Sequence, residues 1–428
     1  MKVILVLLDG LGDRSYKVLN YRTPLEAADT PNLDRLAELG GNGLFHPSSP
    51  GLCFPSETAH FLLFGYDLKN FPGRGLLEAV GENVPFDDSD VIALAHFSVV
   101  RPDDGIFELM RGRDDIPGSK EELRELFLAV DSYEDGDIRF KLHQTRRNDG
   151  IIVISGAVSP YISDSDPITR GKKIGRILPL KNNPEPVRAK LTAKALNRYL
   201  IYCYQQLSGN LKLAQKANFL VTQRCGRRVA LKPFANVWGL NPMMIASPTV
   251  YKGLAHELGF DFVRVKDSED PGRDLKERIQ MAIGDPGHNF FHVHTKVPDE
   301  ISHKGTPLLK KQALESLDLG LKELVGIMEQ SENVMVIVTG DHSTPSDSIL
   351  IHSGETVPVV IAGPNIRRDR VDAFNEISVA SGCLGLLKRR ELMQMALNFA
   401  DRSVLATHQL GDTVNSFIPE DYPPFILK

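Results

Sequence analysis

The sequence predicts an α/β protein with a doubly wound, mostly parallel sheet and a smaller inserted α+β domain. Short apolar runs alternate with helical segments along most of the 428 residues. That alternation is typical of a parallel sheet covered by helices. Two runs, Val3–Leu8 and Val334–Val338, are apolar throughout, as expected for strands buried on both faces. From about Val84 the pattern changes to short strands separated by charged turns, which indicates the insertion.

This change of pattern sets the expected domain boundaries. Residues 1–85 and 186–428 would form a discontinuous core domain, and residues 86–185 an inserted domain. In the insertion we expect strands over 91–100, 138–142 and 151–154 and a helix over 121–129. In the core we expect a helix over 186–207 and further strands at 217–221, 243–247, 260–265, 290–294 and 357–362.

Near the amino terminus, two helices are expected from their first residues. Thr23-Pro24 and Thr30-Pro31 each place a proline in the first turn, where its missing N–H is no loss. Thr30 would be the N-cap of the second helix, and Gly40-Gly41 would end it.

Composition excludes several classes of protein. With 42% hydrophobic and 25% charged residues the chain can bury a large core. A net charge of −5 gives no electrostatic footprint for nucleic acid. No apolar run reaches the roughly 18 residues of a membrane span, and Asp9 interrupts the first run too early for a signal peptide. The four cysteines form no CxxC pair, so we expect a reducing cytoplasm.

An aspartate follows the carboxyl end of each of the two buried strands. Val3–Leu8 leads to Asp9, and Val334–Val338 leads to Asp341 and His342, with His352 ten residues later. Ligands and catalytic groups gather at this edge of open α/β sheets. A buried ionisable pair is costly unless a charge such as a divalent metal compensates it. The alternative is a solvated polar turn.

A third strand, 290–294, is followed by Asp299 and His303. Residues four apart lie on one face of a helix and can hold one ion together. The alternative is an ordinary ion pair on a helix surface.

Ser56 lies where a helix is expected to begin. Serine is a common N-cap, which is the simpler interpretation. The functional alternative is a nucleophile at a helix N-terminus, where backbone N–H groups favour an incoming phosphate.

Together these residues predict a two-metal phosphoryl-transfer site. Mixed carboxylate and imidazole ligands suit Mn²⁺, Zn²⁺ or similar ions. Seven ligands are too many for one tetrahedral ion, whereas two ions can clamp the attacking and leaving oxygens of a phosphate ester. A metal would also activate the Ser56 hydroxyl as a nucleophile. The candidates are Asp9, Ser56, Asp299, His303, Asp341, His342 and His352.

In this chain order, the constellation resembles the alkaline phosphatase superfamily, and more closely the archaeal-type 2,3-bisphosphoglycerate-independent phosphoglycerate mutases. The resemblance runs nearly end to end, through LDGLGDR, PSETAH, GRGLLEAVG, PDEISH, TGDHSTP and HSGETVPVVIAGP. It implies an alkaline-phosphatase-like fold and a glycolytic isomerase that interconverts 3- and 2-phosphoglycerate through a phosphoserine, without 2,3-bisphosphoglycerate.

The same resemblance implies how ions and substrate are held. One ion would take Asp299, His303 and His352, and the other Asp341, His342, Asp9 and the Ser56 oxygen. Mn²⁺ is the expected metal, with Zn²⁺, Co²⁺ or Mg²⁺ as alternatives. The inserted domain would bind the glycerate end of this small phosphate ester; neither a membrane nor a nucleic acid partner is expected. The sequence does not give the oligomeric state.

The departures from the family pattern fall where substrate would bind. Arg74, Arg113 and Arg224 match the family. Leu94, Asp149 and Ser155 occupy places where the family has arginine, and Ile168 a place where it has histidine. The alternative function is therefore a phosphomonoester hydrolase of the same superfamily that acts on a different anion.

Overall fold

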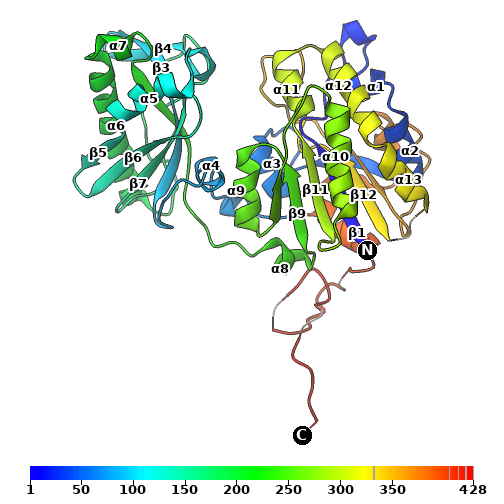
Figure 1. Ribbon diagram of the computed structural model, residues 1–428. Coiled ribbons are helices and arrows are strands. Elements are labelled where there is room, and N and C mark those ends of the chain that lie inside the picture. The colour runs from blue at the N-terminus through cyan, green and yellow to red at the C-terminus, as the bar shows by residue number, and fades with distance from the viewer. Residues whose placement is uncertain (331–332, 404, 413, 420–421, 428) are drawn as a thin grey trace. The chain divides into compact units, whose positions relative to one another are not determined.

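The structure is a computed structural model that describes residues 1–330, 333–403, 405–412, 414–419 and 422–427. The chain divides into two compact units (Figure 1). The first comprises Met1–Phe71 and Leu231–Lys428, and the second comprises Pro72–Ala230. Among the described residues, no helix has both the length and the apolar character needed to cross a bilayer.

The first unit is built on an eight-stranded sheet in the order β10-β9-β11-β1-β12-β13-β2-β14. β1 lies between β11 and β12 and is parallel to both. β13 is antiparallel to β12 and to β2, so the sheet is mostly but not wholly parallel. The strands are β1 Lys2–Leu8, β2 Gly40–His46, β9 Pro242–Ala246, β10 Asp261–Arg264, β11 Phe290–Thr295, β12 Val334–Thr339, β13 Val357–Ala362 and β14 Gly385–Lys388.

Helices cover this sheet, which confirms the predicted α/β class. Successive strand residues point to opposite faces. On the face of Ile4, Val6 and Leu8, the strands share a hydrophobic core with α2, α10, α12 and α13. The helices of the first unit are α1 Pro24–Ala27, α2 Pro31–Leu39, α3 Ser56–Leu63, α8 Phe234–Trp238, α9 Thr249–Leu258, α10 Pro271–Gly284, α11 Val297–Lys304, α12 Pro307–Gly320, α13 Lys322–Gln330 and α14 Glu391–Phe399.

The beginnings and ends of α1 and α2 follow the sequence signals only in part. Thr23 accepts from Glu26 N and closes a full capping box. Thr30 stands at the N-cap of α2, but its side chain makes no capping hydrogen bond. α2 ends at Gly40 as expected, and Gly40 is also the first residue of the unpredicted strand β2.

The second unit contains a six-stranded antiparallel sheet in the order β4-β3-β7-β6-β5, with β8 also paired to β3. Buried side chains of this sheet pack against α5 and α6. The elements are α4 Arg74–Gly81, β3 Val91–Asp103, β4 Ile106–Arg111, α5 Lys120–Ala129, β5 Ser132–Asp135, β6 Ile138–Gln144, β7 Asp149–Ser155, α6 Pro186–Ser208, α7 Leu211–Ala214 and β8 Phe219–Gly226.

The second unit is longer at both ends than the expected insertion 86–185. β8, expected in the core sheet, is antiparallel to β3 instead. α6, also expected in the core, buries Leu196 and Tyr199 in the second hydrophobic core. α4 contacts β3 and β8. The expected boundaries at 85/86 and 185/186 therefore move to 71/72 and 230/231.

Candidate metal centre

Three adjacent parallel strands carry most of the candidate residues to one edge of the sheet. Asp9 follows β1, Asp341 and His342 follow β12, and α11 begins two residues after β11. Because the strands are parallel neighbours, their carboxyl ends meet. The buried Asp9 Oδ1 lies 3.5 Å from His342 Nε2.

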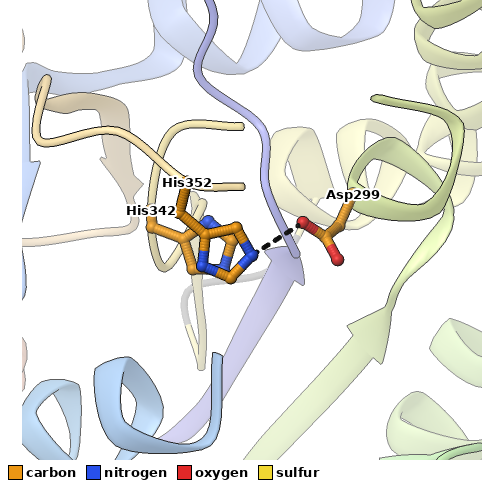
Figure 2. A group of neighbouring side chains, drawn as sticks. All are labelled: Asp299, His342 and His352. Carbon is orange, nitrogen blue, oxygen red and sulfur yellow. Dashed lines mark ion pairs between the residues drawn. The ribbon is translucent and has the colours of Figure 1, made fainter. Parts of the chain in front are cut away.

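Asp299 is the centre of one group of potential ligands. Its Oδ1 lies 3.4 Å from His352 Nε2 (Figure 2) and 3.2 Å from His303 Nε2. Asp299 and His303 stand four residues apart on α11, as their spacing predicted. The rings of His342 and His352 stack with centroids 3.8 Å apart. Asp299, His342 and His352 bring one ligand atom each within 4.8 Å of one another.

A second group combines Asp9, Asp341 and His342, again with one ligand atom each within 4.8 Å. His342 therefore belongs to both groups, whereas the family resemblance assigned it to one ion only. His303 lies beside Asp299 but is in neither of these two groups.

Hydrogen bonds decide which carboxylate oxygen of the second group is available to an ion. Asp341 Oδ1 accepts from the backbone N–H groups of Gly10 and His342, both at 3.0 Å. Asp341 Oδ2 is buried and has no hydrogen-bond partner among the described residues. It lies 3.2 Å from His342 Nε2. A buried carboxylate oxygen without a donor is costly, so this oxygen fits a metal ion.

The hydrogen bonds of Asp9 single out one oxygen in the same way. Asp9 Oδ2 accepts from Tyr251 Oη at 2.8 Å, and His294 Nε2 and Lys296 Nζ lie 3.0 and 3.2 Å away. Oδ1 faces Ser56 Oγ at 3.2 Å. Oδ1 is thus the oxygen that points toward His342 and the serine.

The tautomer of His352 also fits a metal ligand. His352 Nδ1 lies 2.7 Å from the carbonyl oxygen of Phe54. A carbonyl can only accept, so we assign the proton to Nδ1. Nε2 is therefore the ring nitrogen that faces Asp299 and that would bind an ion once its own proton is lost. Burial works to lower the pKa of His352, but the Asp299 carboxylate raises it. Such a backbone contact behind a ligating imidazole is the usual device for fixing its tautomer.

Ser56 is the first residue of α3, not its N-cap. Pro55 holds the cap position, and no side chain caps the helix. The N-cap interpretation of Ser56 is therefore wrong. Its hydroxyl instead lies 3.0 Å from His342 Nε2 and 3.2 Å from Asp9 Oδ1.

Lys296 is a member of the site that the sequence analysis did not single out. Its Nζ donates to Ser56 Oγ at 3.2 Å and contacts Asp299 Oδ2 at 2.9 Å, besides its bond to Asp9. Burial works to lower the pKa of Lys296, but the two carboxylates raise it above its usual value, so the ammonium is retained. The feature of the sequence that could have identified Lys296 is its position directly after strand β11.

The same charges act on the carboxylates. Burial works to raise the pKa of Asp299, but hydrogen bonds from His303 and His352 and the charge of Lys296 hold that pKa well below its usual range. The pKa of Asp9 is also lowered, since Lys296 and His294 outweigh burial and the repulsion of Asp299. Burial lowers the pKa of His342, which favours the neutral imidazole that metals bind.

A layer of buried histidines lies behind these ligands. His60 Nδ1 is 2.7 Å from Ser56 O and 3.4 Å from Asp341 Oδ2. The ring of His60 packs against His292 and His294, with centroids 5.1 and 5.3 Å apart. Burial lowers the pKa of His294 to about 4 and lowers that of His292 as well. His292 and His294 are therefore neutral side chains that support the site.

The arginines expected to bind substrate lie in the second unit. Arg74 is the first residue of α4, and its Nε pairs with Glu78 at 2.7 Å. Arg113 forms a two-pronged ion pair with Asp149, each contact 2.5 Å long. Arg224 has a left-handed backbone, with φ of 55°, and its N–H donates to Asp164 at 2.7 Å.

Comparison with known proteins points in one direction. The sequence model of the metalloenzyme superfamily matches residues 1–399. The 2,3-bisphosphoglycerate-independent phosphoglycerate mutase 2 of Methanocaldococcus jannaschii is 39% identical, over 98% of both chains. The phosphoglycerate mutase of the same kind from Thermoplasma volcanium is 32% identical, over 94% of this chain and 97% of that one.

Solved structures agree with the sequence comparison. The cofactor-independent phosphoglycerate mutase of Thermoplasma acidophilum is 29% identical and superposes with a TM-score of 0.62, over 94% of this chain and all of that one. The PH0037 protein of Pyrococcus horikoshii, 24% identical over 95% and 99% of the two chains, shares the fold with a TM-score of 0.73.

Proposed function

Since the chain belongs to the metalloenzyme superfamily, and within it to the archaeal-type 2,3-bisphosphoglycerate-independent phosphoglycerate mutases, we propose that it interconverts 3-phosphoglycerate and 2-phosphoglycerate through a phosphoserine at Ser56. The observation that carries this proposal is the environment of the Ser56 hydroxyl. It lies among the Asp9 carboxylate, the His342 imidazole and the Lys296 ammonium.

The proposed reaction has two phosphoryl transfers. In the first, Ser56 Oγ forms a bond to phosphorus as the ester oxygen of the substrate leaves. In the second, the other hydroxyl of the retained glycerate attacks the phosphoserine and releases Ser56. The Ser56 hydroxyl faces Asp9 Oδ1 and His342 Nε2. In the first transfer Ser56 loses its proton and the leaving ester oxygen gains one, and the second transfer reverses this exchange at the other hydroxyl. The Lys296 ammonium stands beside Oγ, where it offsets the negative charge of a phosphoryl group.

Two divalent ions are proposed to occupy the centre. The donor set supports this, because three buried carboxylates converge with imidazoles and Asp341 Oδ2 has no hydrogen-bond donor among the described residues. Asp299, His303 and His352 would hold one ion, and Asp9, Asp341, His342 and Ser56 the other. When bound, the ions supply Lewis acidity that activates the hydroxyl and stabilises phosphoryl charge. Mn²⁺ is proposed from the mixed oxygen and nitrogen ligands.

The second unit is proposed to hold the glycerate during its reorientation. Arg74, Arg113 and Arg224 are the candidate contacts. Arg113 already pairs with Asp149 through both prongs of its guanidinium, so a substrate carboxylate has to compete for it. We therefore propose a mutase that also releases some phosphate, and this pair is the one observation that favours the hydrolase as the second candidate.

Transfer within one glycerate requires no added 2,3-bisphosphoglycerate, and we propose that none is needed. A cytoplasmic location is also proposed. All four cysteines are free thiols, which fits a reducing compartment.

The decisive experiment is incubation of the purified protein with 3-phosphoglycerate and Mn²⁺, following 2-phosphoglycerate and free phosphate together. Formation of 2-phosphoglycerate without added bisphosphoglycerate is expected. If 3-phosphoglycerate is neither isomerised nor hydrolysed while other phosphate esters are cleaved, the mutase proposal fails and the hydrolase replaces it.

A further inference from the structure

Thr344 touches ligands of both proposed ions through one hydroxyl group. It lies three residues after Asp341 and is fully buried. Its Oγ1 is 2.8 Å from Asp299 Oδ1 and 3.1 Å from His342 Nδ1. Asp299 is the central carboxylate of one group of potential ligands, and His342 completes the other. Figure 2 shows Asp299 facing the stacked rings of His342 and His352.

Counting protons fixes the direction of both hydrogen bonds. A threonine hydroxyl has one proton, and an ionised carboxylate can only accept. Thr344 therefore donates to Asp299. Its oxygen is then the acceptor for His342, so the ring proton of the neutral imidazole resides on Nδ1. Nε2 is left with a lone pair, directed toward Ser56 Oγ and Asp341 Oδ2 at 3.0 and 3.2 Å.

Without this hydroxyl, His342 Nδ1 would have no hydrogen-bond acceptor among the described residues. Two carboxylates, Asp9 and Asp341, lie within 3.5 Å of His342 Nε2 and would attract a proton to it. A protonated Nε2 cannot bind a metal ion. Asp299 would lose a donor that orients Oδ1 at the same time.

The backbone around Thr344 is fixed from several directions. The fully buried Lys310 donates its three Nζ protons to the carbonyls of Thr344, Gly10 and Gly12, at 2.9, 2.9 and 3.0 Å. Gly10 has a φ of 70°, and a Cβ there would come within 2.7 Å of Thr344 Oγ1 and 2.8 Å of Asp299 Cβ. This glycine permits the close contact of Thr344 with Asp299.

We infer that Thr344 is a positioning residue that prepares ligand atoms for both ions at once. It presents the Asp299 carboxylate to one ion and the Nε2 lone pair of His342 to the other. The inference rests on one part of the proposed function, namely that two divalent ions bind the Asp299 and His342 side chains.

The test compares Thr344→Val, which has nearly the same shape without the hydroxyl, with Thr344→Ser, which keeps it. Metal-free proteins are titrated with Mn²⁺ in a calorimeter. We expect Thr344→Val to weaken binding of both ions by about 10- to 100-fold, as is usual when a group that orients metal ligands is removed. Thr344→Ser should stay within about threefold of the wild type.

Thr339→Val is the matched control. Thr339 is also buried at the end of β12, but its hydroxyl donates to the carbonyl of Pro358, away from the ligands. Its replacement should leave Mn²⁺ affinity unchanged. Wild-type affinity for both ions in Thr344→Val, or a loss confined to one ion, would overturn the inference. A wild-type protein that binds no Mn²⁺ would instead overturn the proposed function.

A second measurement reads the tautomer of His342 directly. In metal-free, ¹⁵N-histidine-labelled wild-type protein, nitrogen chemical shifts report which ring nitrogen carries the proton, and His342→Gln identifies the signal. We expect His342 to be protonated at Nδ1, and in Thr344→Val to shift toward the Nε2 form. A wild-type His342 protonated at Nε2 would refute the inference.

Discussion

At the scale of single residues, Ser56 offers the clearest test of the reaction. Because its side chain caps no helix, Ser56→Ala should keep the fold and avoid the ~0.5–2 kcal/mol loss of a true N-cap. Phosphoryl transfer should fall by about a thousandfold or more if the hydroxyl is the nucleophile. Rapid quenching with labelled substrate should trap phosphate on wild-type Ser56. A stable Ser56→Ala variant with full activity would show that the hydroxyl is dispensable.

The pair of Arg113 and Asp149 is expected to limit mutase activity. Replacing Asp149 with Asn removes the charge that competes with the substrate carboxylate, so kcat/KM for 3-phosphoglycerate should rise by up to about tenfold. Arg113→Ala should lower it, with little effect on hydrolysis of a simple aryl phosphate, which has no carboxylate.

Asp135→Asn provides the control for this prediction. Asp135 pairs with Arg198 at 2.6 Å in the same unit, and its removal should leave both activities unchanged. An Asp149→Asn variant with wild-type mutase kinetics would mean that the pair does not contact substrate.

The aspartates and histidines that meet in the site could be named from the sequence, whereas their supporting residues could not. Asp9 and Asp341 each follow an apolar run, and parallel neighbours must bring such residues together. Tyr251 contacts Asp9 from α9, and Thr344 contacts Asp299 from another segment. A tyrosine or threonine in a sequence does not indicate which residue its hydroxyl will contact, because hydroxyl groups also serve as helix caps and surface groups throughout proteins.

At the scale of elements, His288 links strand β10 to the end of α10. Its ring nitrogens lie 2.9 Å from Asp261 and 3.0 Å from Asp285. Burial works to lower the pKa of His288, but these two carboxylates raise it above 6.5. A raised pKa in the folded state means that the charged imidazole stabilises the fold below about pH 6.5, and that this stabilisation is lost as the pH rises through the folded-state value.

Urea denaturation of His288→Gln at two pH values tests this contribution. The midpoint should fall below that of the wild type by more at pH 5.5 than at pH 8.5. An equal deficit at both values would show that the charge of His288 contributes nothing.

Strands that consist of a continuous apolar run can be predicted from the sequence. A strand that forms only because it pairs with neighbouring strands cannot. β1 and β12 are confirmed because continuous apolar residues in this setting suit a strand buried on both faces. β2 begins Gly40-Gly41-Asn42-Gly43, a sequence with low strand propensity. It forms because it pairs with β13 and β14, and a Cβ at Gly40 would lie 2.6 Å from Ile361 O. The antiparallel direction of β13 has no signature in composition.

At the scale of the whole molecule, the metal centre should contribute to stability as well as to activity. Asp9, Asp299 and Asp341 are all buried within one cluster. Ions that bind only the folded chain stabilise it by about 2.7 kcal/mol at a hundredfold excess over Kd. Chelation should therefore abolish phosphoryl transfer and lower the Tm, and Mn²⁺ should restore both. Full activity in excess chelator, with metal content verified as zero, would contradict the metal-dependent mechanism.

The existence of an insertion could be predicted from the sequence, but its limits could not. The change from continuously apolar runs to strand-like runs separated by charged turns indicated a second unit. The helix over 186–207 has an ordinary amphipathic pattern, and such a pattern does not say which of two cores receives its apolar face. Only the packing of residues such as Tyr199 against Phe140, with ring centroids 4.9 Å apart, assigns it.

The central position of β1 has a consequence for how the chain acquires its fold during synthesis. Val3 is synthesised long before its two neighbours in the sheet, Phe290 and Met335. At ~5–20 residues per second, roughly 15–60 s pass before the first of these partners is made. Throughout that interval a wholly apolar strand has both edges unpaired, while residues 72–230 can already complete a core of their own. Val3–Leu8 therefore cannot take its place in the sheet until β11 and β12 have been synthesised.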